Sequence, residues 1–285
     1  MPGQPATPIA EAEIAVALPR RAQAAHKGDF GRVLIVGGGV GMPGAARLAG
    51  EACLRVGAGL VTVATMVENV AAITAGRPEL ICVPLADPTA LRALIERTDI
   101  VAIGPGLGQS DWAREALAVA LAVDRPMILD ADALNLIAEA KTALTPGPSP
   151  GGRGEKILTP HPGEAARLLG VTTEDIQRDR SKALETLVER YRCVVVLKGA
   201  GTLIGAPGKS PGICDRGNPG MATAGMGDVL TGAIAGILAQ CRDPWAAARV
   251  GVLVHAMAGD RAARAGQRGL IASDVIRELR TCVNV

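Results

Sequence analysis

This sequence has very few aromatic residues: Phe, Trp and Tyr together make up 1% of its 285 residues. Proteins that bind single-stranded nucleic acid stack the bases on aromatic side chains, so the shortage argues against that class. The formal net charge of +2 is also too small to indicate a polyanionic partner. We therefore predict no nucleic-acid partner and a core of aliphatic side chains, since 48% of the residues are hydrophobic.

The sequence also lacks paired cysteines and long hydrophobic runs. Its six cysteines include no C-x-x-C pair and mostly lie within apolar stretches, which is typical of buried thiols in a reducing compartment. No apolar run reaches the ~18 residues of a membrane-spanning helix. The first residues have no basic segment ahead of an apolar core, as a secretory signal would. We therefore predict a cytoplasmic protein without a membrane partner.

Short apolar runs alternate with helical patterns along most of the sequence. Strands separated by helices of this length indicate βαβ units, so we predict an α/β fold with a mostly parallel sheet. The predicted buried strands cover residues 32–36, 60–64, 79–83, 99–103, 126–129 and 192–197, with a short one beginning at 156.

Three further elements are predicted in the second half of the sequence. Residues 173–191 have the pattern of one long, exposed helix. Two short β-like runs at 202–204 and 212–214 indicate a hairpin. Residues 273–280 have the pattern of a last amphipathic helix, with Ser273 as its N-cap.

The predicted domain organisation is simple. Residues 1–25, rich in Pro, Ala and charged side chains, are predicted to form an N-terminal arm, and residues 26–285 a single domain. Residues 144–155 are rich in Pro and Gly, a composition that cannot pack a core, so we predict a mobile surface loop there.

Glycine and polar residues gather where three predicted strands end, at 37–44, 104–108 and 130–135. Ligands bind beyond the carboxyl ends of the strands in parallel sheets, so these segments predict one shared site. The first segment contains a G-x-G-x-x-G pattern, which is the fingerprint of dinucleotide-binding Rossmann folds. The next predicted strand, however, has no acidic residue at its end to hold a ribose, and a Rossmann oxidoreductase is therefore disfavoured.

Residues 218–232 form a glycine-rich turn that leads directly into an apolar helix. Gly225 and Gly227 leave backbone N–H groups free to approach an anion at the helix start, and Asp228 follows at once. An anion hole beside a carboxylate suits phosphoryl transfer, in which the carboxylate takes a proton from the attacking hydroxyl. Alternatively, the glycines form a tight turn and Asp228 caps the helix. Because a helix start stabilises negative charge, we expect a lowered pKa for Asp228 and proton transfer concerted with phosphoryl transfer.

Two other residues are candidates for ligand contacts. Lys198 follows a predicted strand and precedes small residues, so it is a candidate phosphate-binding cation, with a solvated strand end as the alternative. His161 lies between two prolines at the end of a short strand, which favours a ligand contact, and Glu164 lies in the first turn of the helix that follows.

Read together, these motifs resemble the bacterial ADP-dependent NAD(P)H-hydrate dehydratases, which have a ribokinase-like three-layer α/β/α sandwich fold. TPHPGE and the GMGD helix start are specific to that family, whereas the other glycine loops are generic. The matching segments are HKGDFGRVLIVGG (26–38), PGAARLAGEACLRVGAGLVTVAT (43–65), IGPGLGQ (103–109), DADALNL (130–136), LTPHPGEAARLLG (158–170), VVVLKGAGT (194–202) and MATAGMGDVLTGAIAGILAQ (221–240).

The resemblance implies a lyase that repairs hydrated NADH and NADPH, which carry water added across the nicotinamide ring. ADP would phosphorylate the ring hydroxyl, phosphate would be eliminated, and AMP and the restored cofactor would be released. The resemblance also implies Mg²⁺ and a homotetramer. The residues themselves leave ADP or ATP open as the donor and assign no metal ligand.

The resemblance also implies roles for individual residues. Asp228 matches the carboxylate that deprotonates the hydroxyl, and Gly225 and Gly227 match the anion hole. The residues matching the nucleotide site are Lys198, Gly199, Ala200, Gly201, Thr202 and Gly227. Those matching the hydrated-cofactor site are Ala45, Gly106, His161 and Asp228. Asp130, Asp132, Asn135 and Glu164 lie near these positions in the family pattern without an assigned role.

Many bacterial members of the family carry an epimerase domain ahead of this one, and none precedes residue 26 in the sequence. We therefore expect action on the S epimer only, unless a separate NAD(P)H-hydrate epimerase supplies the other activity. Two alternative functions are a ribokinase-fold small-molecule kinase and a nucleotide-sensing module without turnover. TPHPGE argues against the first, and Asp228, a carboxylate where phosphate charge would lie, argues against the second.

Overall fold

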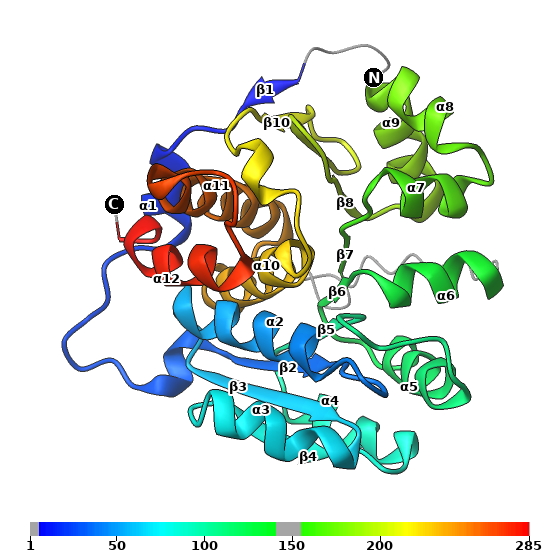
Figure 1. Ribbon diagram of the computed structural model, residues 1–285, viewed down its shortest axis with the longest axis vertical. Coiled ribbons are helices and arrows are strands. Elements are labelled where there is room, and N and C mark those ends of the chain that lie inside the picture. The colour runs from blue at the N-terminus through cyan, green and yellow to red at the C-terminus, as the bar shows by residue number, and fades with distance from the viewer. Residues whose placement is uncertain (1–5, 141–154, 285) are drawn as a thin grey trace.

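The computed structural model describes residues 6–140 and 155–284, and in these residues ten strands form one sheet with helices on both faces (Figure 1). The loop predicted over 144–155 lies outside them, apart from Glu155. The strands are β1 (Thr7–Pro8), β2 (Arg32–Val36), β3 (Leu60–Thr65), β4 (Ile81–Pro84), β5 (Ile100–Ile103), β6 (Met127–Leu129), β7 (Lys156–Leu158), β8 (Val194–Leu197), β9 (Thr202–Gly205) and β10 (Gly212–Cys214).

The strand order is β1-β10-β9-β8-β7-β6-β5-β2-β3-β4. In the part of the sheet that runs β8-β7-β6-β5-β2-β3-β4, every neighbouring pair of strands is parallel, which confirms the predicted α/β sheet. The predicted hairpin is also confirmed, because β9 pairs antiparallel with both β8 and β10. The chain leaves β2 toward β3 and β4, then returns to the other side of β2 at β5. The sheet therefore has a topological switch point between β2 and β5, where α/β proteins bind ligands.

Two layers of helices cover the sheet (Figure 1). One hydrophobic cluster joins the sheet to α1 (Ala12–Ala17), α2 (Pro43–Arg55), α3 (Val70–Gly76), α10 (Met226–Cys241), α11 (Pro244–Ala262) and α12 (Ala272–Cys282). The other joins it to α4 (Leu91–Glu96), α5 (Asp111–Leu121), α6 (Asp132–Ala140), α7 (Pro162–Leu169), α8 (Thr173–Arg178) and α9 (Arg180–Tyr191). Short 3-10 helices lie at Lys27–Phe30, Val67–Asn69, Pro88–Ala90, Pro219–Met221 and Ala263–Ala265.

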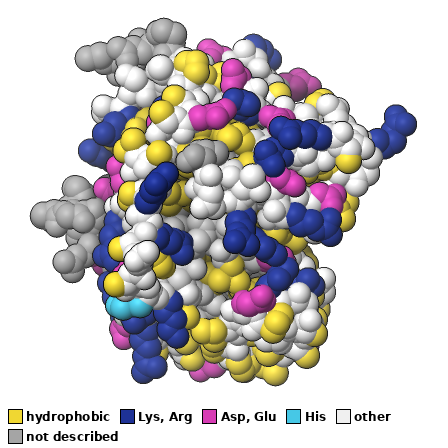
Figure 2. Space-filling model, turned by 90° about the vertical axis from the view of Figure 1, so that its left-hand side faces the viewer, with side chains coloured by type: hydrophobic (Ala, Val, Ile, Leu, Met, Phe, Trp, Pro, Cys, Tyr) yellow, Lys and Arg dark blue, Asp and Glu magenta, His cyan; other side chains and the backbone are white. Residues whose placement is uncertain are grey.

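The apolar strands are buried on both faces because their side chains alternate between the two clusters. In β2, Val33 and Ile35 face the first cluster, and Leu34 and Val36 face the second. Strands of this kind read as continuous apolar runs, as the sequence does. No helix among the described residues has both the length and the hydropathy to cross a bilayer. On the face seen in Figure 2, Lys and Arg side chains are interspersed with acidic and hydrophobic ones, as the small net charge leads one to expect.

Two details of the helix predictions were wrong, the continuity of 173–191 and the N-cap of the last helix, because a side chain accepts a backbone N–H at an unexpected place in each. Residues 173–191 form two helices, because Asp179 leaves the helical conformation and accepts a hydrogen bond from the N–H of Lys182, 2.8 Å away. The last helix starts at Ala272, with Ile271 rather than Ser273 as its N-cap residue. There the Asp274 carboxylate accepts the N–H of Ile271, 3.1 Å away.

Helices α2 and α10 pack against each other with almost no side chain between them. A Cβ atom on Gly232 would lie 2.0 Å from the carbonyl oxygen of Ala49, so the contact requires glycine. Gly225 faces Leu48, and Gly236 faces Cys53, so the two helices run in the same direction. Their N-terminal ends therefore lie together, at the edge where the parallel strands end.

Candidate active site

Two glycine loops meet at the switch point of the sheet. Residues 37–42 follow β2 and residues 104–108 follow β5. The N–H of Gly38 donates to the Pro105 carbonyl at 3.1 Å, and the N–H of Gly39 donates to the Gly106 carbonyl at 2.6 Å. These loops form a wall of the site that consists mainly of backbone.

Ala45 and Gly106, both predicted to line the substrate site, lie against each other. Gly106 has φ +57°, and a Cβ atom there would lie 2.9 Å from the Cβ atoms of both Ala45 and Met42. A larger residue at 106 would displace this wall.

The end of β3 explains why the dinucleotide fingerprint was misleading. Thr65 occupies the place of the acidic residue that a Rossmann fold would use for a ribose. Its hydroxyl instead donates to the Gly38 carbonyl at 2.8 Å. The buried Asn69 amide donates to the carbonyls of Gly38 and Gly39, at 2.6 and 3.0 Å. These residues brace the loop, and neither was recognised from the sequence as part of the site.

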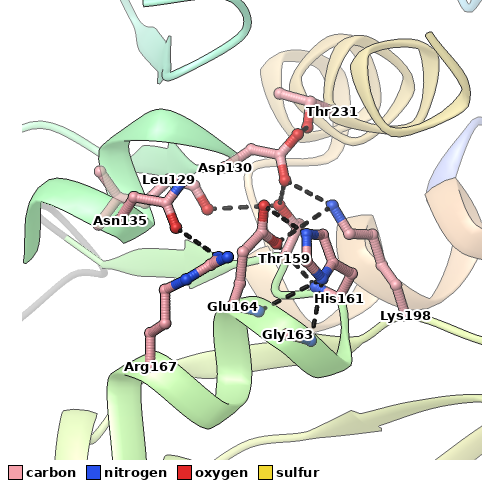
Figure 3. Close-up of polar contacts among 10 residues, drawn as sticks. All are labelled: Leu129, Asp130, Asn135, Thr159, His161, Gly163, Glu164, Arg167, Lys198 and Thr231. Atoms are coloured by element: carbon pink, nitrogen blue, oxygen red, sulfur yellow. Dashed lines mark hydrogen bonds and ion pairs between the residues drawn. The ribbon is translucent and has the colours of Figure 1, made fainter. Parts of the chain in front are cut away.

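Asp130 is the centre of a buried polar cluster (Figure 3). Its side chain is only 1% exposed and follows β6. One carboxylate oxygen accepts from Lys198 Nζ and from the Thr159 hydroxyl, each at 2.7 Å. The other accepts from the Thr231 hydroxyl, also at 2.7 Å. Asp130 thus connects β6, β7, β8 and α10 at one point. Thr159 and Thr231 were not recognised from the sequence, although both belong to the family-like segments.

Lys198 is held inside the site, so the alternative of a solvated strand end was wrong. Besides Asp130, its ammonium lies 3.7 Å from a carboxylate oxygen of Glu164. Burial disfavours the charged amine, but the two carboxylates outweigh this effect and raise the pKa of Lys198. The site therefore contains a fixed positive charge. Burial raises the pKa of Glu164, against the opposing effect of Lys198.

Asp228 lies in the first turn of α10 without capping it. The N-cap residue is Gly225, at φ 88°, and the Asp228 carboxylate receives no hydrogen bond from the described residues. Its pKa is raised to about 7, first by burial and then by the negative charge of Asp130, while Lys198 acts in the opposite direction. The expectation of a lowered pKa was wrong, because desolvation and a nearby carboxylate outweigh the helix dipole here. A carboxylate with a pKa near neutrality can act as a general base at physiological pH.

The start of α10 lies beside the Lys198–Asp130 pair. A Cβ atom on Gly227 would be 3.4 Å from Lys198 Nζ and 3.8 Å from the Asp130 carboxylate. An anion placed over Gly227 would meet the free N–H groups of the helix start and the lysine ammonium together. The geometry is therefore compatible with an anion hole at Gly225–Gly227.

An arginine that was not recognised from the sequence holds the segment 198–202 through its backbone carbonyls. Arg180, the first residue of α9, donates to the carbonyls of Leu197 at 3.1 Å and Lys198 at 3.3 Å, and also to that of Ala200. The N–H groups of residues 199–201 have no backbone acceptor within the described part of the chain. Successive free N–H groups of this kind can bind phosphate oxygens. The only sequence signal for Arg180 is its position directly after the capping Asp179.

His161 forms the N-cap of α7. Its Nδ1 accepts from the N–H of Gly163 at 3.0 Å and of Glu164 at 3.3 Å, so a neutral ring carries its proton on Nε2. Burial lowers the pKa of His161, and the positive charges of Lys198 and Arg167 lower it further. The half-exposed ring is therefore neutral at pH 7, and its Nε2 lies 3.3 Å from a carboxylate oxygen of Glu164.

Asp132 and Asn135 differ in position. Asp132 accepts the N–H of Gly108 at 2.8 Å, so it joins the second glycine loop to the polar side of the site. Asn135 accepts from the Arg167 guanidinium at 3.0 Å and braces α6 against α7. The contacts of Asn135 are those of a structural residue.

No group of three or more His, Cys, Asp or Glu side chains within residues 6–140 and 155–284 is arranged to hold a metal ion. Mg²⁺ does not require such a group in phosphoryl transfer, because it binds substrate phosphates and one or two carboxylates. Asp132 has one carboxylate oxygen free of the Gly108 contact, and oxygen ligands suit this ion. The site therefore fits a magnesium ion carried mainly by a nucleotide.

A family model for NAD(P)H-hydrate dehydratases matches residues 33–281. The chain belongs to the NAD(P)H-hydrate dehydratase family. Among curated relatives, the bifunctional NAD(P)H-hydrate repair enzyme Nnr of Coxiella burnetii is 52% identical over 94% of this chain and 53% of that protein. The chain thus spans about half the length of the curated relatives it matches. These findings confirm the resemblance read from the motifs.

Solved structures of the family have the same fold. The ADP/ATP-dependent NAD(P)H-hydrate dehydratase of Bacillus subtilis, co-crystallised with ATP and Mg²⁺, is 32% identical and superposes with a TM-score of 0.88 over 98% of each chain. A ribokinase-like superfamily protein of Enterococcus faecalis is 30% identical, with a TM-score of 0.89 over 99% of this chain and 97% of its own. The predicted ribokinase-like fold is confirmed.

Proposed function

We propose that this member of the family is a lyase that dehydrates the S epimer of hydrated NADH or NADPH. ADP is the phosphoryl donor, and AMP, phosphate and the restored cofactor are the products. The observation that carries the proposal is Asp228, a carboxylate with a pKa of about 7 beside the start of α10 and the fixed charge of Lys198. That arrangement suits transfer of a phosphoryl group to a hydroxyl.

In the first step, the ring hydroxyl lies between the glycine-loop wall at Ala45 and Gly106 and the carboxylate of Asp228. Asp228 accepts the hydroxyl proton as the oxygen bonds to the β-phosphorus of ADP and the bond to the AMP oxygen breaks. Lys198 and the N–H groups at Gly227 stabilise the charge on the transferring phosphoryl group. In the second step, phosphate leaves with the electron pair of the ring C–O bond, a proton leaves the adjacent ring carbon, and the double bond is restored.

The remaining residues bind and orient. The N–H groups of residues 199–201, with Lys198 and Thr202, hold the nucleotide phosphates. His161, whose ring is half-exposed, contacts the hydrated cofactor. Mg²⁺, held by the phosphates and Asp132, would neutralise phosphate charge.

The choice of donor, the assembly and the location belong to the same proposal. The Bacillus subtilis neighbour, named ADP/ATP-dependent and co-crystallised with ATP and Mg²⁺, supports a nucleotide and magnesium; ADP as the preferred donor is our inference. The name "bifunctional" of the curated relatives supports cooperation with an epimerase activity. We further propose a homotetramer in the cytoplasm.

The test is a spectrophotometric assay with hydrated NADPH, Mg²⁺ and either ADP or ATP. Wild type is compared with Asp228→Asn and with Asp215→Asn, an exposed aspartate that serves as the matched control. The expected result is a return of reduced-nicotinamide absorbance with ADP, lost in Asp228→Asn and retained in Asp215→Asn. Return only with ATP would correct the donor. A stable phosphorylated product would favour the kinase alternative, and equal ADP binding without phosphate release by wild type and Asp228→Asn would favour the sensor.

A further inference from the structure

The tip of the first glycine loop exposes two apolar side chains that are separated by one glycine in the sequence. Val40 is 73% exposed and Met42 is 38% exposed, on either side of Gly41. The remaining large exposed hydrophobic residues of the described chain are single residues at Val16, Val67, Ile81, Val171 and Ile271. Scattered apolar residues need no explanation, but two on one loop at the edge of a site suggest a surface that a ligand covers.

The base of this loop is held firmly, so the tip is presented in a defined position. The carbonyls of Gly38 and Gly39 accept hydrogen bonds from the buried side chains of Thr65 and Asn69. The N–H of Met42 donates back to the Gly39 carbonyl at 3.0 Å, which closes a tight turn with Val40 at its tip. The apolar side chains therefore stand on a braced support.

Met42 faces the second glycine loop. A Cβ atom on Gly106 would lie 2.9 Å from the Met42 Cβ, and one on Gly108 would lie 3.5 Å from the Met42 methyl group. Gly108 is in turn bound to Asp132, whose negative charge acts on Asp228. Met42 thus lies on the same wall as Ala45 and Gly106.

The aromatic side chains of the protein are all engaged elsewhere. The Phe30 ring lies under the Arg21 guanidinium at 3.6 Å, and the Trp245 ring lies 5.3 Å from that of Arg249. Trp112 donates to the Leu85 carbonyl at 2.8 Å, and Tyr191 donates to that of Leu168 at 3.2 Å. A flat ring that binds at the glycine loops must therefore pack against aliphatic side chains.

We propose that Val40 and Met42 form an apolar cap that packs against the hydrated nicotinamide ring while the ring hydroxyl faces Asp228. This inference rests on the proposed function and names the side chains that recognise its substrate. The cap contacts the ring and leaves the nucleotide site at residues 198–202 untouched. It therefore contributes to affinity for the hydrated cofactor and does not change affinity for ADP.

The test is the double variant Val40→Ser/Met42→Ser, assayed with hydrated NADPH varied at saturating ADP and then with ADP varied at saturating hydrated NADPH. In the proposed complex the bound ring partly buries both apolar side chains. Because serine loses this contribution, the KM for hydrated NADPH should increase about 10-fold. The KM for ADP should stay within about 2-fold, since no contact to the nucleotide is removed. Both side chains are exposed, so the melting temperature should be unchanged.

Two controls make the result specific. Val40→Ile/Met42→Leu keeps the apolar character and should retain the wild-type KM for hydrated NADPH. Val171→Ser removes an exposed valine, 45% exposed on the turn between α7 and α8, and should change neither KM. An active wild type together with an unchanged KM in the serine double variant would overturn the cap alone. A wild type that does not turn over hydrated NADPH with any donor would overturn the proposed function and the cap with it.

Discussion

The two walls of the site are built from different materials. The wall over β2 and β5 is backbone: glycine loops joined by N–H···O=C bonds and braced by Thr65 and Asn69. The wall over β6 to β8 and the start of α10 carries charge. There Lys198 is bonded to Asp130, and the charges of both residues act on the pKa of Asp228. The first wall can select a ligand by shape, and the second can move a proton and a phosphoryl group. Changes to the two walls should therefore have different consequences.

Lys198→Met should produce the largest effect, because it leaves the buried Asp130 charge without its partner. Breaking a buried ion pair in this way costs about 3–5 kcal/mol of unfolding free energy, measurable by urea unfolding. Activity should also be lost. The double variant Lys198→Met/Asp130→Asn should recover much of the stability but none of the activity. Equal stability of the single and double variants would show that the pair is not coupled.

Gly106→Val should act on the other wall. The added side chain would meet Ala45 and Met42, so the KM for hydrated NADPH should rise by more than about 10-fold, equivalent to roughly 1.4 kcal/mol. ADP affinity, measured by calorimetry, should be unchanged. A matched change at Gly170, where a Cβ atom would meet nothing within 4 Å, should leave the KM unaltered. Weaker ADP binding in Gly106→Val would mean that the two walls are not independent.

Asp228→Asn should stabilise the protein at high pH while abolishing activity. The folded pKa of about 7 lies above the ordinary value of 3.8, so the folded state holds an extra proton between these values. Wild-type stability therefore falls as pH rises from about 4 to 7, and the asparagine variant escapes this loss. The gain at pH 8 should be on the order of 1–2 kcal/mol, reduced by partial solvent exposure, and smaller at pH 5. Urea unfolding at both pH values checks this, and a gain that does not grow with pH would contradict it.

The same raised pKa predicts the pH dependence of the reaction. Because the base must be deprotonated, kcat/KM should fall below pH 7, with an apparent pKa of about 7 for the free enzyme. Removal of the neighbouring negative charge in Asp130→Asn should lower this apparent pKa, so that kcat/KM falls at a lower pH than in the wild type. An apparent pKa of kcat/KM that is the same in Asp130→Asn as in the wild type would assign the titration to another group.

Thr65→Val should have the smallest effect. It removes one hydrogen bond to the Gly38 carbonyl, at a cost of about 1 kcal/mol in stability. Because Asn69 still holds that carbonyl, the KM for hydrated NADPH should rise only a few-fold. Thermal unfolding and steady-state kinetics measure both quantities. An unchanged KM would mean that Asn69 alone positions the loop.

Much of the fold followed from local patterns. Apolar runs identified the strands of the parallel part, and the glycine segments identified the loops at their ends. The break at Asp179 escaped prediction, because the helical pattern continues across it and only the Asp179 side chain, which accepts the N–H of Lys182, interrupts the helix. Arg180, Thr159 and Thr231 also escaped, since each contributes through a partner distant in sequence. The domain boundaries and residue roles remain predictions.

The sequence alone determined the α/β architecture, the resemblance to the family and the placing of a carboxylate at the start of an apolar helix. These features depend on composition and on neighbours along the chain. Only the tertiary structure decided the protonation of that carboxylate, because burial and the charge of Asp130 depend on distances through space. It also decided that Lys198 lies inside the site rather than in solvent, since the strand order brings β6, β7 and β8 side by side.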